Sequence, residues 1–168
     1  MRRLFLSLIL VFGVGIGTID AQTNSVNVSD LFGEFKKCEH ADYVHIPKLL
    51  IKLASVFAKD EDESDRKVMR AVSSVRILDL SDCSSDVKLS FADKLNRLKT
   101  SGYEKLIQQK SKDEQSLILT KMKKNCIREL VIVSSDGDDC TLLLIKGKIR
   151  PKDVHALIND KNSLFSKK

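Results

Sequence analysis

The densest group of side chains able to bind a metal ion consists of Cys38, His40, Asp42 and His45. Thiolate, imidazole and carboxylate groups are the usual protein ligands of zinc. Residues 43–46 (YVHI), however, have the alternation of a short β-strand, whose side chains point to opposite faces in turn. His40 would precede this strand, at the end of a helix whose dipole it complements. We therefore assign no metal ligand, and keep His40 and His45 as the residues with which metal binding can be tested.

The sequence contains four cysteines, Cys38, Cys83, Cys126 and Cys140. In an exported protein an even number of cysteines indicates disulfides, and four allow three complete pairings. A hairpin turn centred near Gly137 would place Cys140 opposite Ser134. Cys126 would then lie opposite Lys148, about 26 Å farther along the strands at about 3.3 Å per residue. Because a disulfide needs Cα atoms within about 7 Å, this hairpin excludes a Cys126–Cys140 bond. Pairings with either of the first two cysteines, and free buried thiols, stay open.

Motifs for other chemistry are missing from the sequence. There are three histidines, and neither Gly-x-Ser-x-Gly, Cys-x-x-Cys nor a glycine-rich phosphate loop occurs. Residues 60–71 begin with alternating acids, as calcium loops do. Asp65 and Ala71 occupy the sixth and twelfth positions, where such a loop needs Gly and Glu. We therefore expect a protein that is not an enzyme and has no cofactor, with no catalytic, cofactor-binding or metal-binding residue.

The charge of the chain is moderately basic and spread along the sequence. Removing residues 1–21 deletes Arg2, Arg3 and Asp20 and lowers the net charge from +6 to +5. The absence of Trp and the presence of two Tyr leave little surface on which bases could stack. We therefore expect no nucleic-acid partner.

The N-terminal residues have the order of a secretory signal peptide. A basic start at Arg2 and Arg3 is followed by the apolar residues 4–16, and the small residue Ala21 suits cleavage. The apolar run is shorter than the roughly 20 residues that span a bilayer, and no later stretch is long enough. We expect residues 1–21 to be a signal peptide and residues 22–168 to form one domain, located in the periplasm or secreted.

Residues 115–148 organise the predicted fold. Apolar, strand-like runs at 126–134 and 140–146 flank Asp136 and Gly137, and Asp-Gly between such runs is a strong hairpin signal. A further strand at 115–123 would join them through a tight turn near Lys124.

The remaining elements are predicted to cover this sheet. Ser29 or Asp30 would cap a first helix, and strands are expected at 43–46, 75–80 and 103–109. Pro47 would start a helix, and Pro151 a short last one. The helix after Pro47 is expected to turn four apolar residues inward, Leu49, Leu50, Leu53 and Phe57. A later amphipathic helix carries Val87, Phe91, Leu95 and Leu98. The order predicts an α+β fold: a mixed, mainly antiparallel sheet with helices packed largely on one face.

Four segments resemble the domain of unknown function 4252 family of small exported bacterial proteins: residues 43–55 (YVHIPKLLIKLAS), 75–81 (VRILDLS), 102–114 (GYEKLIQQKSKDE) and 127–149 (IRELVIVSSDGDDCTLLLIKGKI). The resemblance implies an envelope or secreted location and assigns no functional residue. Many members look like lipoproteins, and this sequence lacks the cysteine that would follow the signal.

Two functional hypotheses remain. The first is an exported, non-catalytic envelope protein that binds another protein through an exposed edge or face of its sheet. The second is a small-ligand-binding or metal-binding periplasmic protein. After signal cleavage no transmembrane segment is expected in either case.

Overall fold

The fold is seen in a computed structural model that describes residues 25–57, 63–111, 114–136 and 138–152. The signal peptide predicted at residues 1–21 lies outside these residues. So does the helix predicted from Pro151, apart from its first two positions.

Ten elements follow one another in the predicted order. They are α1 (Val28–Phe35), β1 (Asp42–Pro47), α2 (Lys48–Phe57), α3 (Glu63–Ala71), β2 (Val72–Asp79), α4 (Ser85–Asn96), β3 (Glu104–Lys110), β4 (Gln115–Lys123), β5 (Cys126–Ser135) and β6 (Cys140–Ile149).

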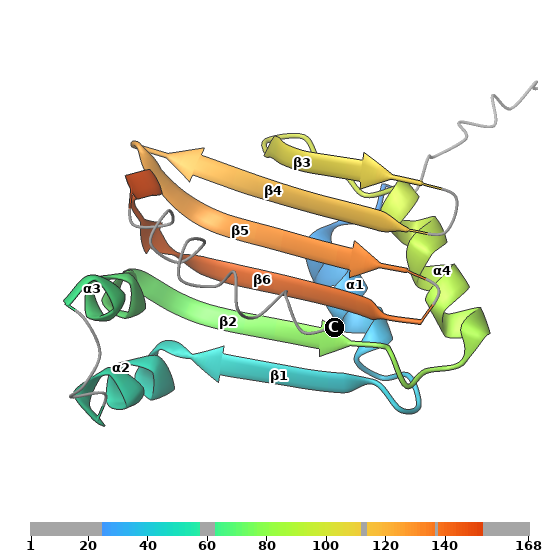
Figure 1. The fold of residues 1–168 in the computed structure, drawn as a ribbon, viewed down its shortest axis with the longest axis horizontal. Coiled ribbons are helices and arrows are strands. Elements are labelled where there is room, and N and C mark those ends of the chain that lie inside the picture. The colour runs from blue at the N-terminus through green and yellow to red at the C-terminus, as the bar shows by residue number, and fades with distance from the viewer. Residues whose placement is uncertain (1–24, 58–62, 112–113, 137, 153–168) are drawn as a thin grey trace, which may run out of the picture.

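The strands form one six-stranded sheet in the order β1-β2-β6-β5-β4-β3, with β1 and β3 at its edges (Figure 1). Every neighbouring pair is antiparallel. Strands β3 to β6 are joined in succession, and β2 then pairs with the far side of β6. The α+β class with an antiparallel sheet is therefore confirmed.

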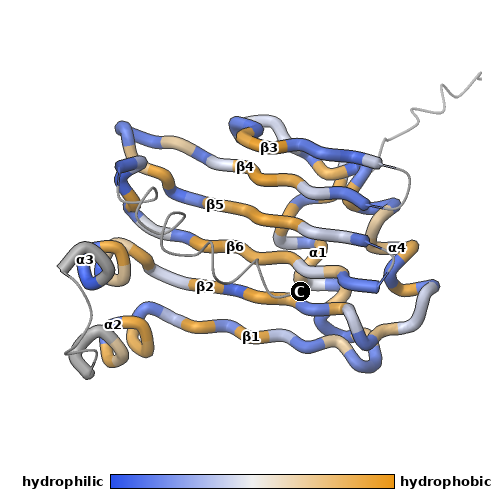
Figure 2. The backbone as a smooth tube through the Cα atoms, in the orientation of Figure 1, coloured by the Kyte–Doolittle hydropathy of each residue, from blue (hydrophilic) through white to orange (hydrophobic). Residues whose placement is uncertain are grey.

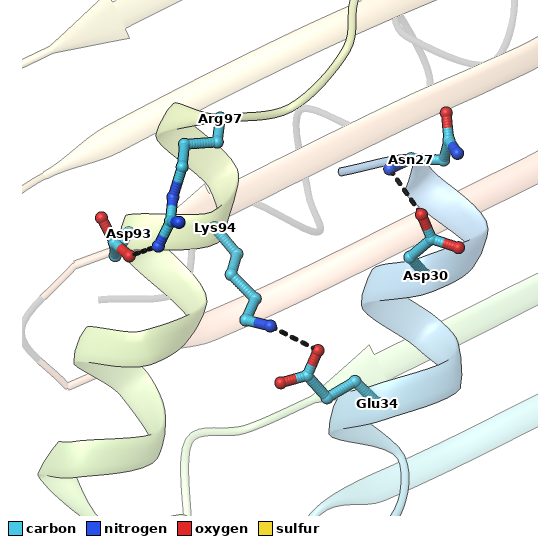
Figure 3. Close-up of polar contacts among 6 residues, drawn as sticks. All are labelled: Asn27, Asp30, Glu34, Asp93, Lys94 and Arg97. Carbon is cyan, nitrogen blue, oxygen red and sulfur yellow. Dashed lines mark hydrogen bonds and ion pairs between the residues drawn. The ribbon is translucent and has the colours of Figure 1, made fainter. Parts of the chain in front are cut away.

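Helices α1 and α4 cover one face of the sheet, here called the inner face. Alternate strand residues supply its core, among them Leu78, Leu119, Val131, Val133, Leu142 and Leu144. Phe35 of α1 meets Phe91 of α4 edge-to-face, with ring centroids 5.2 Å apart. An ion pair of 2.6 Å between Lys94 Nζ and Glu34 Oε2 also joins the two helices (Figure 3). The apolar stripe predicted for α4 is thus the one that packs.

Among the described residues, helices α2 and α3 cover one end of the opposite, outer face. Ile51 of α2 and Val68 of α3 are buried there against Leu130 and Ile149. Thus α1 and α4 lie on the inner face and α2 and α3 on the outer face, with the larger core on the inner one.

The cap of α1 differs from the prediction. Asn27 is the capping residue, so Ser29 and Asp30 stand inside the first turn. Asp30 Oδ2 accepts the backbone N–H of Asn27 at 2.9 Å (Figure 3). A carboxylate at this third helical position reaches back to the cap, which explains why Asp30 marks the helix start without being its cap.

Both predicted hairpins form. Lys124 and Asn125 have φ values of 51° and 55°, the pattern of a two-residue hairpin turn. In the second hairpin Asp136 Oδ1 accepts the backbone N–H groups of Asp138 and Asp139, at 3.0 and 2.6 Å. Strand β5 extends to Ser135, so the connection to β6 is one residue shorter than predicted.

The shorter turn corrects the predicted register. Cys140 pairs with Ser135 instead of Ser134. At the other end of the same ladder Ile127 pairs with Ile149, so Cys126 lies beyond Ile149 and the predicted partner Lys148 is also wrong.

The inward face predicted for α2 is wrong. Leu49, Leu50 and Leu53 are exposed, and Ile51 is the helix residue buried in the core. The side chain of Phe57 lies outside what the structure describes.

Candidate functional site

The side chains first considered as metal ligands do not converge. His40 has a φ of 62° in the connection after α1, and its exposed ring has Nε2 3.6 Å from Glu39 Oε1. Asp42 and His45 belong to β1, three residues apart, and so lie on opposite faces. Cys38 packs against the inner core. Within the described residues, no three His, Cys, Asp or Glu side chains are placed to hold one metal ion.

All four cysteines carry free thiols. Cys126 opens β5 and Cys140 opens the antiparallel β6, which puts them at opposite ends of the sheet. The predicted separation of this pair is confirmed. Cys38 lies between α1 and β1, whereas Cys83 lies between β2 and α4.

A polar cavity of about 320 Å³ lies beside the first turn of α1, and we call it the polar pocket. The connection from α4 to β3 and the inner-face side chains of strands β4 to β6 form its other walls. Its charged and hydrogen-bonding side chains include Asp30, Lys99, Tyr103, Lys121, Glu129 and Lys146.

Glu129 is the residue around which the polar pocket is built. Tyr103 donates its hydroxyl hydrogen to Glu129 Oε2 at 2.5 Å, and Lys146 Nζ lies 3.5 Å from Glu129 Oε1. Glu129 and Lys146 are cross-strand partners on β5 and β6. Lys121 Nζ lies 5.5 Å from the centroid of the Tyr103 ring, within reach of a cation–π interaction.

The strands change register beside this pocket. Shifts occur in the β3–β4 pair between Lys105 and Ile107, in the β4–β5 pair at Lys121, and in the β5–β6 pair next to Glu129. A bulge adds twist and re-aims the neighbouring side chains, and bulges are common next to functional sites. Here they border the positions from which Lys121 and Glu129 enter the polar pocket.

The electrostatics fix the protonation states of the central pair. Burial, then the hydrogen bond to Glu129 and the charge of Glu129, raise the pKa of Tyr103. Burial alone would raise the pKa of Glu129 as well. The hydrogen bond from Tyr103 and the charges of Lys146 and Lys121 outweigh burial and lower the pKa of Glu129. Near neutral pH the carboxylate is ionised and the phenol is protonated.

This arrangement suits binding better than proton transfer. General acid–base catalysis is most effective when a pKa lies near the working pH, and both pKa values are moved away from neutrality. The pocket has three lysines, Lys99, Lys121 and Lys146, against the two acids Asp30 and Glu129. The first turn of a helix also favours negative charge. The pocket can therefore hold a small anionic group.

The polar pocket is not predicted by the sequence pattern. The pattern gives Tyr103 only as the start of a strand at 103–109 and Lys121 only as part of the strand at 115–123. A signal was present, because Glu129 interrupts the inward-facing series of β5 that continues with Val131 and Val133. A charged residue at an inward-facing position of an otherwise apolar strand face normally has a function or a partner.

A second candidate site is the exposed apolar group Val44, Leu49, Leu50 and Leu53, here called the α2–β1 apolar surface. The exposed fractions of these side chains are 48%, 76%, 51% and 52%. At 100° per residue, Leu49 and Leu53 lie roughly opposite the buried Ile51 on the helix. They therefore point away from the sheet. Figure 2 shows the apolar colour of α2 beside β1 at one end of the molecule.

The α2–β1 apolar surface continues onto the outer face as a row of six aliphatic residues that crosses every strand. The cross-strand pairing joins them as Val44, Ile77, Leu143, Ile132, Ile118 and Ile107. None of the six is fully buried. On one side, the next row packs in the cluster with α2 and α3 through Ile46, Val75, Ile145 and Leu130. On the other side, the next row is polar. Figure 2 shows the apolar bands along the strands.

No helix within the described residues is long and apolar enough to cross a membrane.

The comparisons with curated proteins and with solved structures found no match to this chain. The sequence pattern of the family described as "domain of unknown function (DUF4252)" matches residues 35–157. This match spans the chain from the end of α1 to beyond β6 and covers most of the polar pocket and all of the α2–β1 apolar surface. The chain therefore belongs to the domain of unknown function 4252 family.

Proposed function

We propose that the protein is exported to the periplasm or secreted and acts there as a non-catalytic envelope protein that binds another protein. The observation that carries this proposal is the exposure of Leu49, Leu50 and Leu53 on one helix. Large apolar groups gathered at a surface typically mark a site of protein or membrane contact. The signal-like residues 1–21 support export.

The surroundings of these leucines favour a protein partner with an apolar face. The adjacent strand β1 is an edge of the sheet, so its outer backbone groups have no strand neighbour within the part of the chain that the structure describes. Such an edge accepts an extended segment by strand addition. Val44 of β1, the strand that leads directly into this helix, is the first residue of the aliphatic row on the outer face. One partner could contact the helix, the edge and part of the row together.

The central residues of the polar pocket support a non-catalytic role. Glu129 is held ionised by Tyr103 and two lysines, and Tyr103 is held protonated. Neither group is prepared to exchange a proton at neutral pH.

The test replaces apolar contacts on α2 without touching its buried residue. We expect Leu49→Glu combined with Leu53→Glu to lose the partner that the wild-type protein retains after mild cross-linking in its own host. Leu89→Glu is the matched control, because Leu89 is a leucine of α4 with 69% exposure, far from the α2–β1 apolar surface in sequence and packing. This control should keep the partner.

Two results would contradict the proposal. The first is an unchanged set of partners in the doubly substituted protein. The second is a fall in melting temperature as large as that of a core substitution, which would show that the leucines pack within the chain. Export is checked separately by mass analysis of the protein recovered from the envelope or the medium. Its N-terminal peptide should begin at Gln22. A protein retaining residues 1–21 would argue against cleavage.

The polar pocket favours a second candidate function, the binding of a small molecule with a carboxylate or phosphate group. Calorimetric titration with inorganic phosphate tests it. Saturable binding should weaken at least about tenfold, or about 1.4 kcal/mol, when Lys99 and Lys121 are both replaced by Ala. Lys123→Ala at the exposed β4–β5 turn is the control. Absence of saturable binding to the wild-type protein, or equal binding by all variants, would remove this function.

A further inference from the structure

Cys38 and Cys83 lie in two connections that meet at one end of the sheet. Cys38 stands between α1 and β1, and Cys83 between β2 and α4. The first residue of β1, Asp42, pairs with the last residue of β2, Asp79. Each cysteine is four residues outside this pair. The antiparallel ladder therefore brings the two connections side by side.

The thiol of Cys83 reaches into the connection that carries Cys38. Its Sγ lies 3.3 Å from the backbone carbonyl oxygen of Glu39, the residue that follows Cys38. Both cysteines pack in the inner core, Cys83 buried and Cys38 partly exposed. Burial and next the Cys38 thiol raise the pKa of Cys83, and Cys38 has a larger influence than the adjacent Asp82. The two thiols are thus close neighbours in the folded chain.

The other two cysteines are placed differently. Cys140 is fully buried, and its Sγ lies 3.0 Å from the Oγ of Ser135, its partner in the ladder. Cys126 begins β5 beside the turn at Lys124 and Asn125, at the opposite end of the sheet. Neither of these thiols is among the groups that shift the pKa of Cys83.

We propose that Cys38 and Cys83 are joined by a disulfide when the protein meets a thiol oxidant, while Cys126 and Cys140 stay as thiols. Two S–H bonds of the cysteines and the S–S bond of the oxidant break, and one S–S bond forms between the cysteines. The two electrons and two protons pass to the oxidant, a disulfide such as glutathione disulfide, and convert it into two thiols. The partly exposed Cys38 attacks the oxidant first, and Cys83 then displaces the reduced half of the oxidant from the mixed disulfide.

The disulfide fastens the beginning of β1 to the segment that leads into α4. It does not depend on a protein partner or on the polar pocket. An oxidising compartment would supply the oxidant after export, whereas a glutathione buffer supplies it for the purified chain. Failure of the disulfide and failure of the proposed protein binding are therefore separate results.

The experiment equilibrates the folded, full-length chain in glutathione buffer, blocks free thiols with N-ethylmaleimide after unfolding, and measures the intact mass. We expect two blocked thiols in the wild-type protein and four after reduction. Trypsin cleaves after Lys37, Lys48, Arg76 and Lys88. The oxidised sample should therefore contain peptide 38–48 linked to peptide 77–88, and each of these peptides has one cysteine.

Single substitutions by serine identify the pair. Cys126→Ser and Cys140→Ser should retain the linked peptides, whereas Cys38→Ser and Cys83→Ser should lose them. The proposal is overturned if the wild-type protein keeps four free thiols in a buffer that oxidises a reference dithiol. It is equally overturned if the linked peptides contain Cys126 or Cys140. Mass analysis requires no folded variant, so the wild-type peptides decide the question even if a variant is unstable.

Discussion

Glu129 occupies an inward-facing position of β5 where its neighbours on the same face, Val131 and Val133, are buried and apolar. A charged group in such a place costs free energy unless it is paired and hydrogen-bonded. Tyr103 supplies the hydrogen bond and Lys146 the opposite charge. The carboxylate is thus retained in the fold by two partners that come from different strands or connections.

Removing the hydroxyl of Tyr103 tests whether its hydrogen bond stabilises the Glu129 carboxylate. We expect Tyr103→Phe to lower the free energy of unfolding by about 1–2 kcal/mol at pH 7, because a hydrogen bond to a charged group is lost. The matched control is Tyr43→Phe, since the Tyr43 hydroxyl makes no hydrogen bond seen in the described part of the chain. Urea unfolding measures both.

The loss of unfolding free energy caused by Tyr103→Phe should depend on pH with a definite sign. The pKa of Glu129 is lower in the folded protein than its ordinary value. The stabilisation is therefore complete above the ordinary carboxyl pKa of about 4.3 and is lost as the pH falls through the lowered value. The cost of Tyr103→Phe should be full at pH 7 and smaller at pH 3. A cost that is equal at both pH values would show that the ionised carboxylate is not the acceptor.

At the scale of elements, α3 runs directly into β2 between Ala71 and Val72. The last carbonyl of the helix lies against β6 at Gly147, where an added Cβ would stand 2.5 Å from Ala71 O and 3.1 Å from Ile149 Cγ1. The backbone of β6 therefore approaches the end of α3 as closely as only glycine permits.

A pair of glycine substitutions checks this packing. Gly147→Ala should destabilise the protein by about 1–3 kcal/mol, because backbone atoms must move to make room. Gly33→Ala in α1 should raise the free energy of unfolding by about 0.5–1 kcal/mol, because alanine is the better helix residue. No heavy atom lies within 4 Å of its added Cβ. Similar effects of the two substitutions on thermal unfolding would refute the close contact at Gly147.

The order of the elements was predictable because local signals specify it. The Asp136–Gly137 turn, the turn at Lys124 and the stripe of α4 each act within a few residues. The buried side of α2 was not predictable, because the apolar side that its period selects, with Leu49, Leu50 and Leu53, stays exposed. Ile51, which lies outside that side, is buried instead. The contact between Tyr103 and Glu129 was not predictable either, because these residues are 26 positions apart in the sequence. Register shifts in three strand pairs border this contact, and the sequence pattern does not locate them.

At the scale of the whole molecule, the sheet has one face closed by α1 and α4 and another covered at one end. The strand next to the most exposed apolar group, β1, is also an edge strand, and within the described residues its ladder to β2 is the one that holds it. A covalent bond between Cys38 and Cys83 would secure this edge at the end opposite to α2. The surface proposed to bind a partner would then be carried by a strand that is fastened at both ends.

The disulfide should accordingly change global stability. It closes a loop of 45 residues between positions 38 and 83. The chain-entropy model then predicts a gain of about 4 kcal/mol in the free energy of unfolding, less any strain in the folded state. Urea unfolding of the oxidised and reduced wild-type chain measures this difference. The Cys38→Ser, Cys83→Ser double variant should match the reduced protein in both buffers. If oxidation stabilised the double variant by the same amount, the gain would have to come from another bond.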